Sequence, residues 1–375
     1  MKRIIAIVIV IFLFVLPINA EKINNDVFSQ IQDELNIFKE SVPQEIMDLF
    51  PNEIWNGDFS GLIESNLNET SIIDKVLDYF FIGINEAFKN FAVILILIIV
   101  ASVFNSLGQT FSSNLITTTF SFASTLCISI SVFSLCHNII SMVSSYIKAL
   151  CIVMESIAPL MSTLYIMTGN ITSAGFANAS LILFISFIEQ FLIIFMLPIV
   201  NICLSFSIMK AINSNLDFSG ITKILKNTFV SVTVFVMSIL MFVFSSKNIL
   251  AQASDTLSIK TAKFAISSFI PIVGSTVNEA LKTVVASLSS IKSSCGIIVI
   301  IVIALLMLPI IISLLVNRLF FNISASLART LNCSSESSIF EEAGSICGFL
   351  LALILCTCIL FIFTISILIK TTVIA

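Results

Sequence analysis

Charged side chains are scarce in this sequence. Of its 375 residues, 11% are Asp, Glu, Lys or Arg and 58% are hydrophobic, whereas a soluble chain carries about 25% charged residues. The mean hydropathy is +1.11. This deficit excludes an ordinary soluble fold, because apolar surface on this scale is stable only against lipid. We therefore expect an all-α polytopic membrane protein.

Side chains suited to catalysis are also rare. His137 is the one histidine, and neither a nucleophile with its base nor a glycine-rich phosphate loop accompanies it. No pair of aspartates lies within the apolar runs, as an intramembrane hydrolase requires. We expect no enzymatic activity, cofactor or metal site. A hydrolase that uses His137 remains an alternative, which full activity of a His137→Ala protein would exclude.

The cysteine pattern excludes a disulfide framework. All nine cysteines lie at or beyond Cys127, and their spacing matches no zinc motif. Cys356 and Cys358 face different sides of a predicted helix, so we interpret the cysteines as small buried side chains. Basic residues interleaved with aromatic residues, a feature of nucleic-acid-binding proteins, are absent as well, so no nucleic acid partner is expected.

Residues 1–20 have the pattern of a secretory signal peptide. Lys2 and Arg3 precede an apolar run at 4–16, and Ala20 is a small residue at the cleavage position. The run is shorter than the roughly 20 residues that span a bilayer, which favours cleavage. An uncleaved anchor helix is the alternative. The mature chain is expected to begin near Glu21.

The mature N-terminal segment, residues 21–89, is strongly acidic. It holds fourteen acidic residues and four lysines, whereas residues 90–375 hold eight acidic and twelve basic residues. An acidic segment behind a signal peptide predicts an extracytoplasmic N-terminus, since basic residues concentrate in cytoplasmic loops.

Two amphipathic helices are predicted within this segment. Val27, Ile31, Leu35 and Phe38 recur at helical spacing before Pro43. A second helix is predicted to begin at Ser71, whose hydroxyl can cap it. Because so short a segment builds only a small core, we expect it to dock on the membrane surface or on a partner.

Residues 90–375 form the predicted transmembrane bundle, with six full spans and two shorter stretches. The spans are 91–106, 115–136, 180–209, 229–245, 296–316 and 346–369. The shorter stretches, 145–167 and 258–288, each contain a proline, so we predict broken, re-entrant helices that protein or a water-filled cavity surrounds.

The distribution of basic residues orients these spans. With the mature N-terminus outside, five basic residues fall in the cytoplasm: Lys210, Lys223, Lys226, Arg318 and Arg329. Three lysines depart from the rule because they fall outside: Lys247, Lys260 and Lys263.

An internal repeat is the most informative pattern. Pro159 matches Pro271 at an offset of 112, and the Met-Leu-Pro-Ile sequence at 196–199 recurs at 307–310. We predict two parallel tandem repeats, about 115–210 and 228–320, followed by the final span at 346–369, with a site or pathway at their interface. Coincidence is the alternative, because Ile, Ser and Leu are abundant.

Polar residues near these prolines are the candidates for function. A carboxylate at the bilayer centre costs about 2.5–3.5 kcal/mol, so Glu155 and Glu189 need a reason to be there. Either they line a solute or proton path or contact a polar partner, or they only fix packing. The hydroxyls of Ser162 and Thr163 can instead satisfy carbonyls freed by the proline. The candidate pathway or partner-contact residues are Glu155, Pro159, Ser162, Thr163, Glu189, Pro271, Gly274, Ser275, Asn278 and Glu279.

Three segments resemble a known family. They are Asp-Phe-Ser-Gly at 58–61, Ile-Lys-Thr-Ala-Lys-Phe-Ala at 259–265 and Phe-Ile-Pro-Ile-Val-Gly at 269–274. With the order and length of the other elements, they make nearly the whole chain resemble the stage III sporulation protein AE family of endospore-forming bacteria.

The resemblance implies a multi-pass protein of the mother-cell membrane, a permease-like subunit of the channel complex between mother cell and forespore. It implies other membrane proteins of that complex, a cytosolic ATPase and a ring-forming channel as partners, besides membrane lipid. It supplies no catalytic residue. A non-conducting scaffold that assembles the complex is the alternative function.

Overall fold

The computed structural model describes residues 32–48, 69–110, 114–212, 218–269 and 274–370. These ranges are helical and contain no strand. A first helix covers 32–41. The others are α3 (Gln44–Met47), α6 (Glu69–Thr110), α7 (Asn114–Met167), α8 (Ile171–Ile212), α9 (Ser219–Phe269), α10 (Gly274–Thr330) and α11 (Ser334–Lys370). The predicted signal peptide lies outside the described residues.

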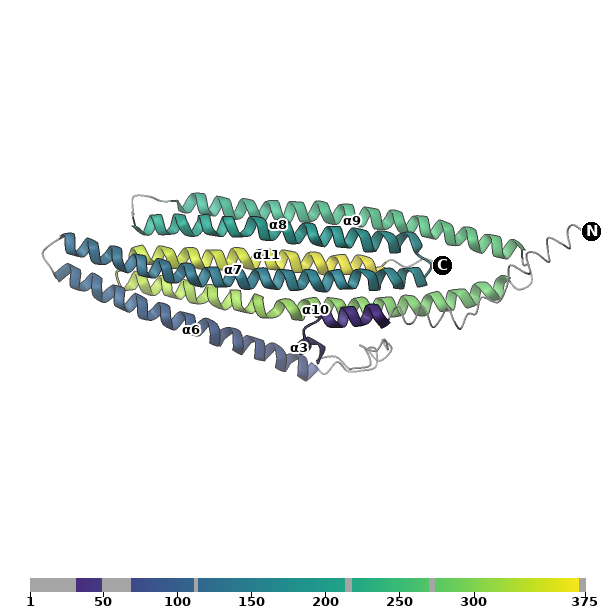
Figure 1. Cartoon of the computed structure of the whole chain (residues 1–375), viewed down its shortest axis with the longest axis horizontal. Helices are drawn as coiled ribbons and strands as arrows, with labels where there is room; N and C mark the ends of the chain where they lie inside the picture. Colours follow the sequence, from purple (N-terminus) through teal and green to yellow (C-terminus); the bar gives the residue numbers. More distant parts are fainter. Residues whose placement is uncertain (1–31, 49–68, 111–113, 213–217, 270–273, 371–375) are drawn as a thin grey trace, which may run out of the picture.

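The six long helices form an antiparallel bundle (Figure 1). Each of α6 to α11 is long and apolar enough to cross a membrane, and each contains one of the six predicted spans. The prediction of an all-helical protein with six candidate membrane spans is therefore confirmed.

The helices differ greatly in length, so the bundle has projecting ends. The 54 residues of α7 exceed the 42 of α8, a difference of about 18 Å at 1.5 Å per residue. The 57 residues of α10 exceed the 37 of α11, a difference of about 30 Å. As a result, the α6–α7 hairpin projects at one end of the bundle and the α9–α10 hairpin at the other (Figure 1). The end with the projecting α6–α7 hairpin is also where α8 ends and α9 begins, and we call it the α8–α9 end. The end with the projecting α9–α10 hairpin is also where α7 ends and α8 begins, and we call it the α7–α8 end.

The stretch at 145–167 is not the separate broken helix that the sequence predicts, whereas the break predicted at Pro271 lies outside the described residues. Residues 145–167 are the continuation of α7, which runs through Pro159 without a break. Residues 258–288 are divided between the end of α9 and the beginning of α10, and Pro271 lies outside the described residues. A proline inside a helix costs about 3 kcal/mol. Around Pro159 this cost is offset by packing, since Ala158, Leu160 and Met161 are fully buried.

The helix boundaries do not reproduce the predicted repeat. Pro198 and Pro309 both lie inside the second helix of a hairpin, in α8 and α10. Pro159 lies inside α7, and its predicted counterpart Pro271 lies outside the described residues. The tandem repeat thus stays a prediction.

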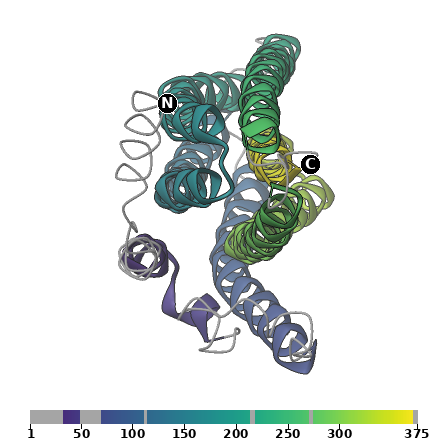
Figure 2. The same cartoon turned by 90° about the vertical axis from the view of Figure 1, so that its right-hand side faces the viewer.

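The core lies where α10 and α11 pack together. The apolar windows of these two helices are 61% and 56% buried, against 22% for α6 and α9. Figure 2 shows α11 enclosed by its neighbours, and it packs against α7, α8, α9 and α10. At the α7–α8 end, the Tyr165 hydroxyl donates to the Leu368 carbonyl at 2.5 Å, and the buried Lys292 ammonium lies 4.8 Å from the Tyr165 ring centroid. These contacts join α7, α10 and α11.

A buried carboxylate on α9 caps the N-terminus of α8. The two oxygens of Asp255 accept the backbone N–H groups of Thr172 and Ser173 at 2.9 and 2.8 Å. Gly169, with φ of 81°, makes the tight turn that brings α8 to this position. The free N–H groups of a helix start carry partial positive charge, so they compensate the carboxylate.

The N-terminal segment docks on the bundle of its own chain. Leu35, Phe38, Val42 and Ile46 are at most 3% exposed and belong to the main core cluster. The described part of the segment, residues 32–48, thus packs on the bundle, and the contact of segment 21–89 with the membrane surface or a partner stays a prediction.

Candidate functional site

Glu155 and Glu189 lie on the two adjacent helices of one hairpin. Glu155 is on α7 and Glu189 on α8, and both are half-buried. The sequence separates the two carboxylates by 34 residues. The α7–α8 hairpin brings them together, because the two helices pack antiparallel.

The docked N-terminal helix lies beside Glu155. The Ser41 and Ser156 hydroxyls are 2.7 Å apart, so helix 32–41 lies against α7 beside Glu155. Its outer face carries the exposed Asp33 and Glu40, which are too costly to desolvate in hydrocarbon. Glu155 therefore lies level with a helix that carries charge on its outer face.

Glu189 lies deeper in the bundle. Glu155 is 12 residues from the end of α7 and Glu189 is 18 residues from the start of α8. The difference of six residues corresponds to about 9 Å along the bundle. The two carboxylates thus lie at different distances from the α7–α8 end, and we call this staggered pair the carboxylate step.

The hydroxyls after Pro159 do not satisfy the carbonyl that the proline frees, which is that of Glu155. Ser162 donates to the Ala174 carbonyl of α8 at 3.2 Å, and Thr163 donates to the carbonyl of Pro159 itself at 3.1 Å. The expectation that they satisfy the freed carbonyl is wrong, because Ser162 points across the helix interface. Its bond ties α7 to α8.

The second set of candidate residues lies elsewhere. Pro271 is outside the described residues, and four positions are in the first turns of α10: Gly274, Ser275, Asn278 and Glu279. Gly296 on α10 is level with Met161 on α7. Glu279 precedes Gly296 by 17 residues, or about 25 Å along the helix. The structure therefore does not bring this set next to Glu155 and Glu189.

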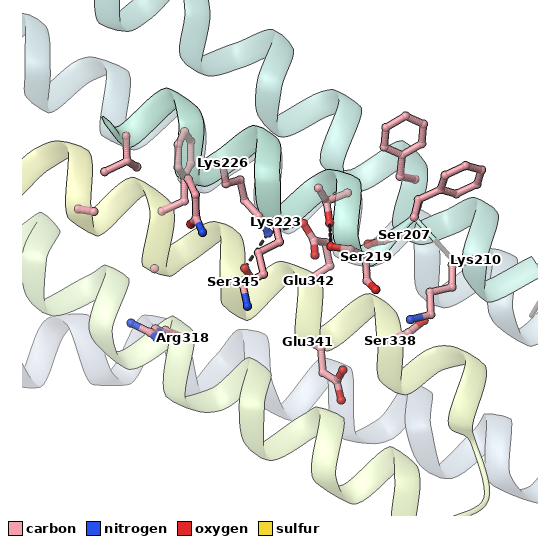
Figure 3. Close-up of a pocket in the computed structure, with 18 of the residues that line it drawn as sticks. Ser207, Lys210, Ser219, Lys223, Lys226, Arg318, Ser338, Glu341, Glu342 and Ser345 are labelled. Carbon is pink, nitrogen blue, oxygen red and sulfur yellow. Dashed lines mark hydrogen bonds and ion pairs between the residues drawn. The ribbon is translucent and has the colours of Figure 1, made fainter. Parts of the chain in front are cut away.

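A basic cavity of about 700 Å³ lies at the α8–α9 end (Figure 3). Its lining comes from α8, α9, α10 and α11 and includes four basic side chains. These are Lys210, Lys223, Lys226 and Arg318. Two acidic residues, Glu341 and Glu342, complete the charged lining. Sequence reasoning used these bases only to orient the spans and missed the cavity.

A buried ion pair closes the inner wall of the cavity. Lys226 donates to the carboxylate of Glu342 and to the hydroxyl of Ser345, both at 2.6 Å. The two charged side chains are 7% and 12% exposed. Removing one partner of such a pair leaves an uncompensated charge, at a cost of about 3–5 kcal/mol. The pair therefore fixes α9 against α11.

The described residues offer no metal centre, because no three His, Cys, Asp or Glu side chains converge there. His137 is an exposed residue within α7. The arrangement provides two polar features instead, which are the carboxylate step at one end of the bundle and the basic cavity at the other.

A family model for stage III sporulation protein AE matches residues 58–372. The chain belongs to the stage III sporulation protein AE family. Membership connects the chain with sporulation. A relative in Bacillus subtilis (strain 168), named stage III sporulation protein AE, is 21% identical over 161 residues, which are 43% of this chain and 40% of that protein. No solved structure matches the chain.

Proposed function

We propose that this member of the family is the permease-like membrane subunit of the channel complex between mother cell and forespore. Membership of a sporulation family supports the process, and six membrane-crossing helices support the location. The observation that carries the permease-like role is the pair of half-buried carboxylates, Glu155 and Glu189, on the two helices of one hairpin in an otherwise apolar bundle. The subunit is proposed to act without turnover chemistry.

The proposed orientation follows from charge. Helix 32–41 and the α7–α8 end face the space between the two cells, and the α8–α9 end faces the mother-cell cytoplasm. The basic cavity then lies on the cytoplasmic side. The other membrane proteins of the complex pack beside the bundle, and a cytosolic ATPase contacts the α8–α9 end.

Thiol accessibility tests the polar path. In a full chain without its nine native cysteines, Glu189→Cys is compared with Phe187→Cys on the same helix. Phe187 is nearly level with Glu189 and 48% exposed on the outside of the bundle. A membrane-impermeant thiol reagent is expected to modify the cysteine at 189 much faster than the one at 187. Equally slow modification at both positions would refute a hydrated path.

A scaffold is the second candidate, and the projecting α9–α10 hairpin favours it. Leu250, Leu257 and Phe264 on α9 are between 67% and 73% exposed and follow the helix toward its projecting end. Apolar residues on such a projection suit contact with membrane partners. In this reading the acidic N-terminal segment recruits partners as well.

Deletion of residues 25–84 tests the scaffold. Partner capture from sporulating cells is compared between the deleted and complete chains at equal membrane levels. Loss of capture supports the scaffold, and retained capture counts against recruitment through this segment.

A further inference from the structure

We propose that the basic cavity at the α8–α9 end binds the phosphate headgroup of an anionic phospholipid. The cavity is lined by charged, hydroxyl and aromatic side chains from four helices. The argument rests on the charge balance of its lining, on its apolar walls and on its level in the bundle.

The charge balance leaves two cations available. Within the described residues, the carboxylate of Glu342 pairs with Lys226 and that of Glu341 pairs with Arg329, which lies outside the lining. Lys210 takes part in an interaction of its own. Among the described residues, no carboxylate lies within ion-pair distance of Lys223 or Arg318. A guanidinium and an ammonium facing one cavity suit a phosphate, which accepts several charge-assisted hydrogen bonds.

The position of Arg318 depends on a glycine. A Cβ atom at Gly348 would lie 3.1–3.3 Å from three guanidinium atoms of Arg318. The absence of a side chain at position 348 lets the guanidinium of α10 lie flat across α11. This close approach places the Arg318 charge in the cavity wall opposite α9, where Lys223 lies (Figure 3).

Apolar walls favour a lipid over a free anion. Phe206, Phe218, Val230 and Phe349 line the same cavity as the bases. A water-soluble phosphate gains nothing from these side chains, whereas the glycerol and the first methylenes of a phospholipid bury apolar surface against them.

The level of the cavity also suits a lipid headgroup. Lys210 is the last residue of the apolar stretch of α8, and Lys223 lies four residues after Ser219, the first residue of that of α9. In the proposed orientation this end is cytoplasmic, and basic pockets between membrane helices on that side bind anionic headgroups.

The test measures binding of phosphatidylglycerol to the full chain purified in a neutral detergent. Lys223→Gln with Arg318→Gln is compared with a control that changes the same charge elsewhere, Lys247→Gln with Lys370→Gln. All four side chains are exposed, so the variants are expected to keep the unfolding midpoint of the lipid-free protein. Added phosphatidylglycerol is expected to raise the unfolding midpoint of the wild type and of the control. Added phosphatidylcholine is expected to leave it unchanged.

In the cavity variant, the apparent affinity for phosphatidylglycerol is expected to fall by about 10- to 100-fold, since two charge-assisted bonds are lost. A variant with Arg318→Lys alone keeps the charge and is expected to retain most of the response. An unchanged response of the cavity variant would overturn the proposal. An equal rise of the midpoint with inorganic phosphate alone would overturn a lipid as the ligand and assign the cavity to a soluble anion.

Discussion

Replacing Asp255 by alanine is expected to destabilise the α7–α8 end of the bundle. Asp255 is 3% exposed and accepts two backbone N–H groups at the start of α8. Ser173 is fully buried, so its N–H group loses its acceptor at a cost of about 1–3 kcal/mol. Thr172 is exposed and its N–H group can turn to water. Loss of the cap and of its charge adds about 0.5–2 kcal/mol.

Together these effects predict a loss of about 2–4 kcal/mol for Asp255→Ala. The Asp255→Asn protein keeps one acceptor oxygen and is expected to lose about half as much. Denaturant titration of the full chain in detergent measures the free energy of unfolding. Hydrogen exchange of the amides of residues 172 and 173 measures the local effect.

Asp78→Ala, at an exposed position on α6, is the matched control for the loss of one acidic side chain. It is expected to change the free energy of unfolding by less than about 0.5 kcal/mol. If the free energy of unfolding of Asp255→Ala equals that of this control and hydrogen exchange at 172 and 173 is unchanged, the cap does not stabilise the start of α8.

Three further predictions concern packing and docking. Cysteines at positions 41 and 156, where the Ser41 and Ser156 hydroxyls are 2.7 Å apart, are expected to form a disulfide on mild oxidation, seen as a mobility shift that a reductant reverses. Gly296→Ala is expected to destabilise by about 1–3 kcal/mol, because its new methyl group meets the side chain of Ile369, and Ile369→Ala should restore part of the loss in denaturant titration. Burial and the neighbouring Asp33 raise the pKa of the Glu34 carboxyl, so docking of helix 32–41 is expected to be strongest below its ordinary pKa of about 4.5 and to weaken as the pH rises through the raised value. Glu34→Gln should remove this pH dependence. The measurement is the rate at which the cysteines at 41 and 156 form their disulfide at each pH, compared between the protein with Glu34 and the Glu34→Gln variant.

Each of these has its own control. Ser145 is exposed on α7, eleven residues before Ser156, and a cysteine there should not link to position 41. Gly175 has open space around it, so Gly175→Ala should not destabilise. Glu40→Gln changes the same charge at an exposed position and should leave the pH dependence intact. A link between cysteines at 145 and 41 would contradict the docked helix. Equal destabilisation by Gly175→Ala would contradict the packing at α11, and loss of the pH dependence in Glu40→Gln would contradict the role of Glu34.

The sequence predicts the six spans because a run of apolar residues reports exposure to lipid or core directly. It does not predict how far each helix continues. The predicted span at 115–136 stops before His137, but α7 continues to Met167, and His137, Asn138 and Ser141 are exposed positions on its surface. A helix ends where its backbone hydrogen bonds end, and polar side chains facing outward do not interrupt them.

The candidate site is only partly predictable for a related reason. Glu155 and Glu189 stand out because acids are rare within apolar runs, and the hairpin that brings them together follows from a short turn. The basic cavity does not stand out, because Lys223 and Arg318 are 95 residues apart and meet only through the packing of α9 and α10 around α11. A charged residue at the end of a span indicates orientation, whether or not it also lines a cavity.

The carboxylate step from Glu155 to Glu189 is tested most directly in sporulating cells. Glu155→Gln with Glu189→Gln preserves the size and shape of both side chains and replaces each charged carboxylate by a neutral amide. The permease-like role predicts that heat-resistant spores fall sharply in number while the protein stays at its normal level in the membrane. A normal number of heat-resistant spores from cells that carry this variant would contradict it.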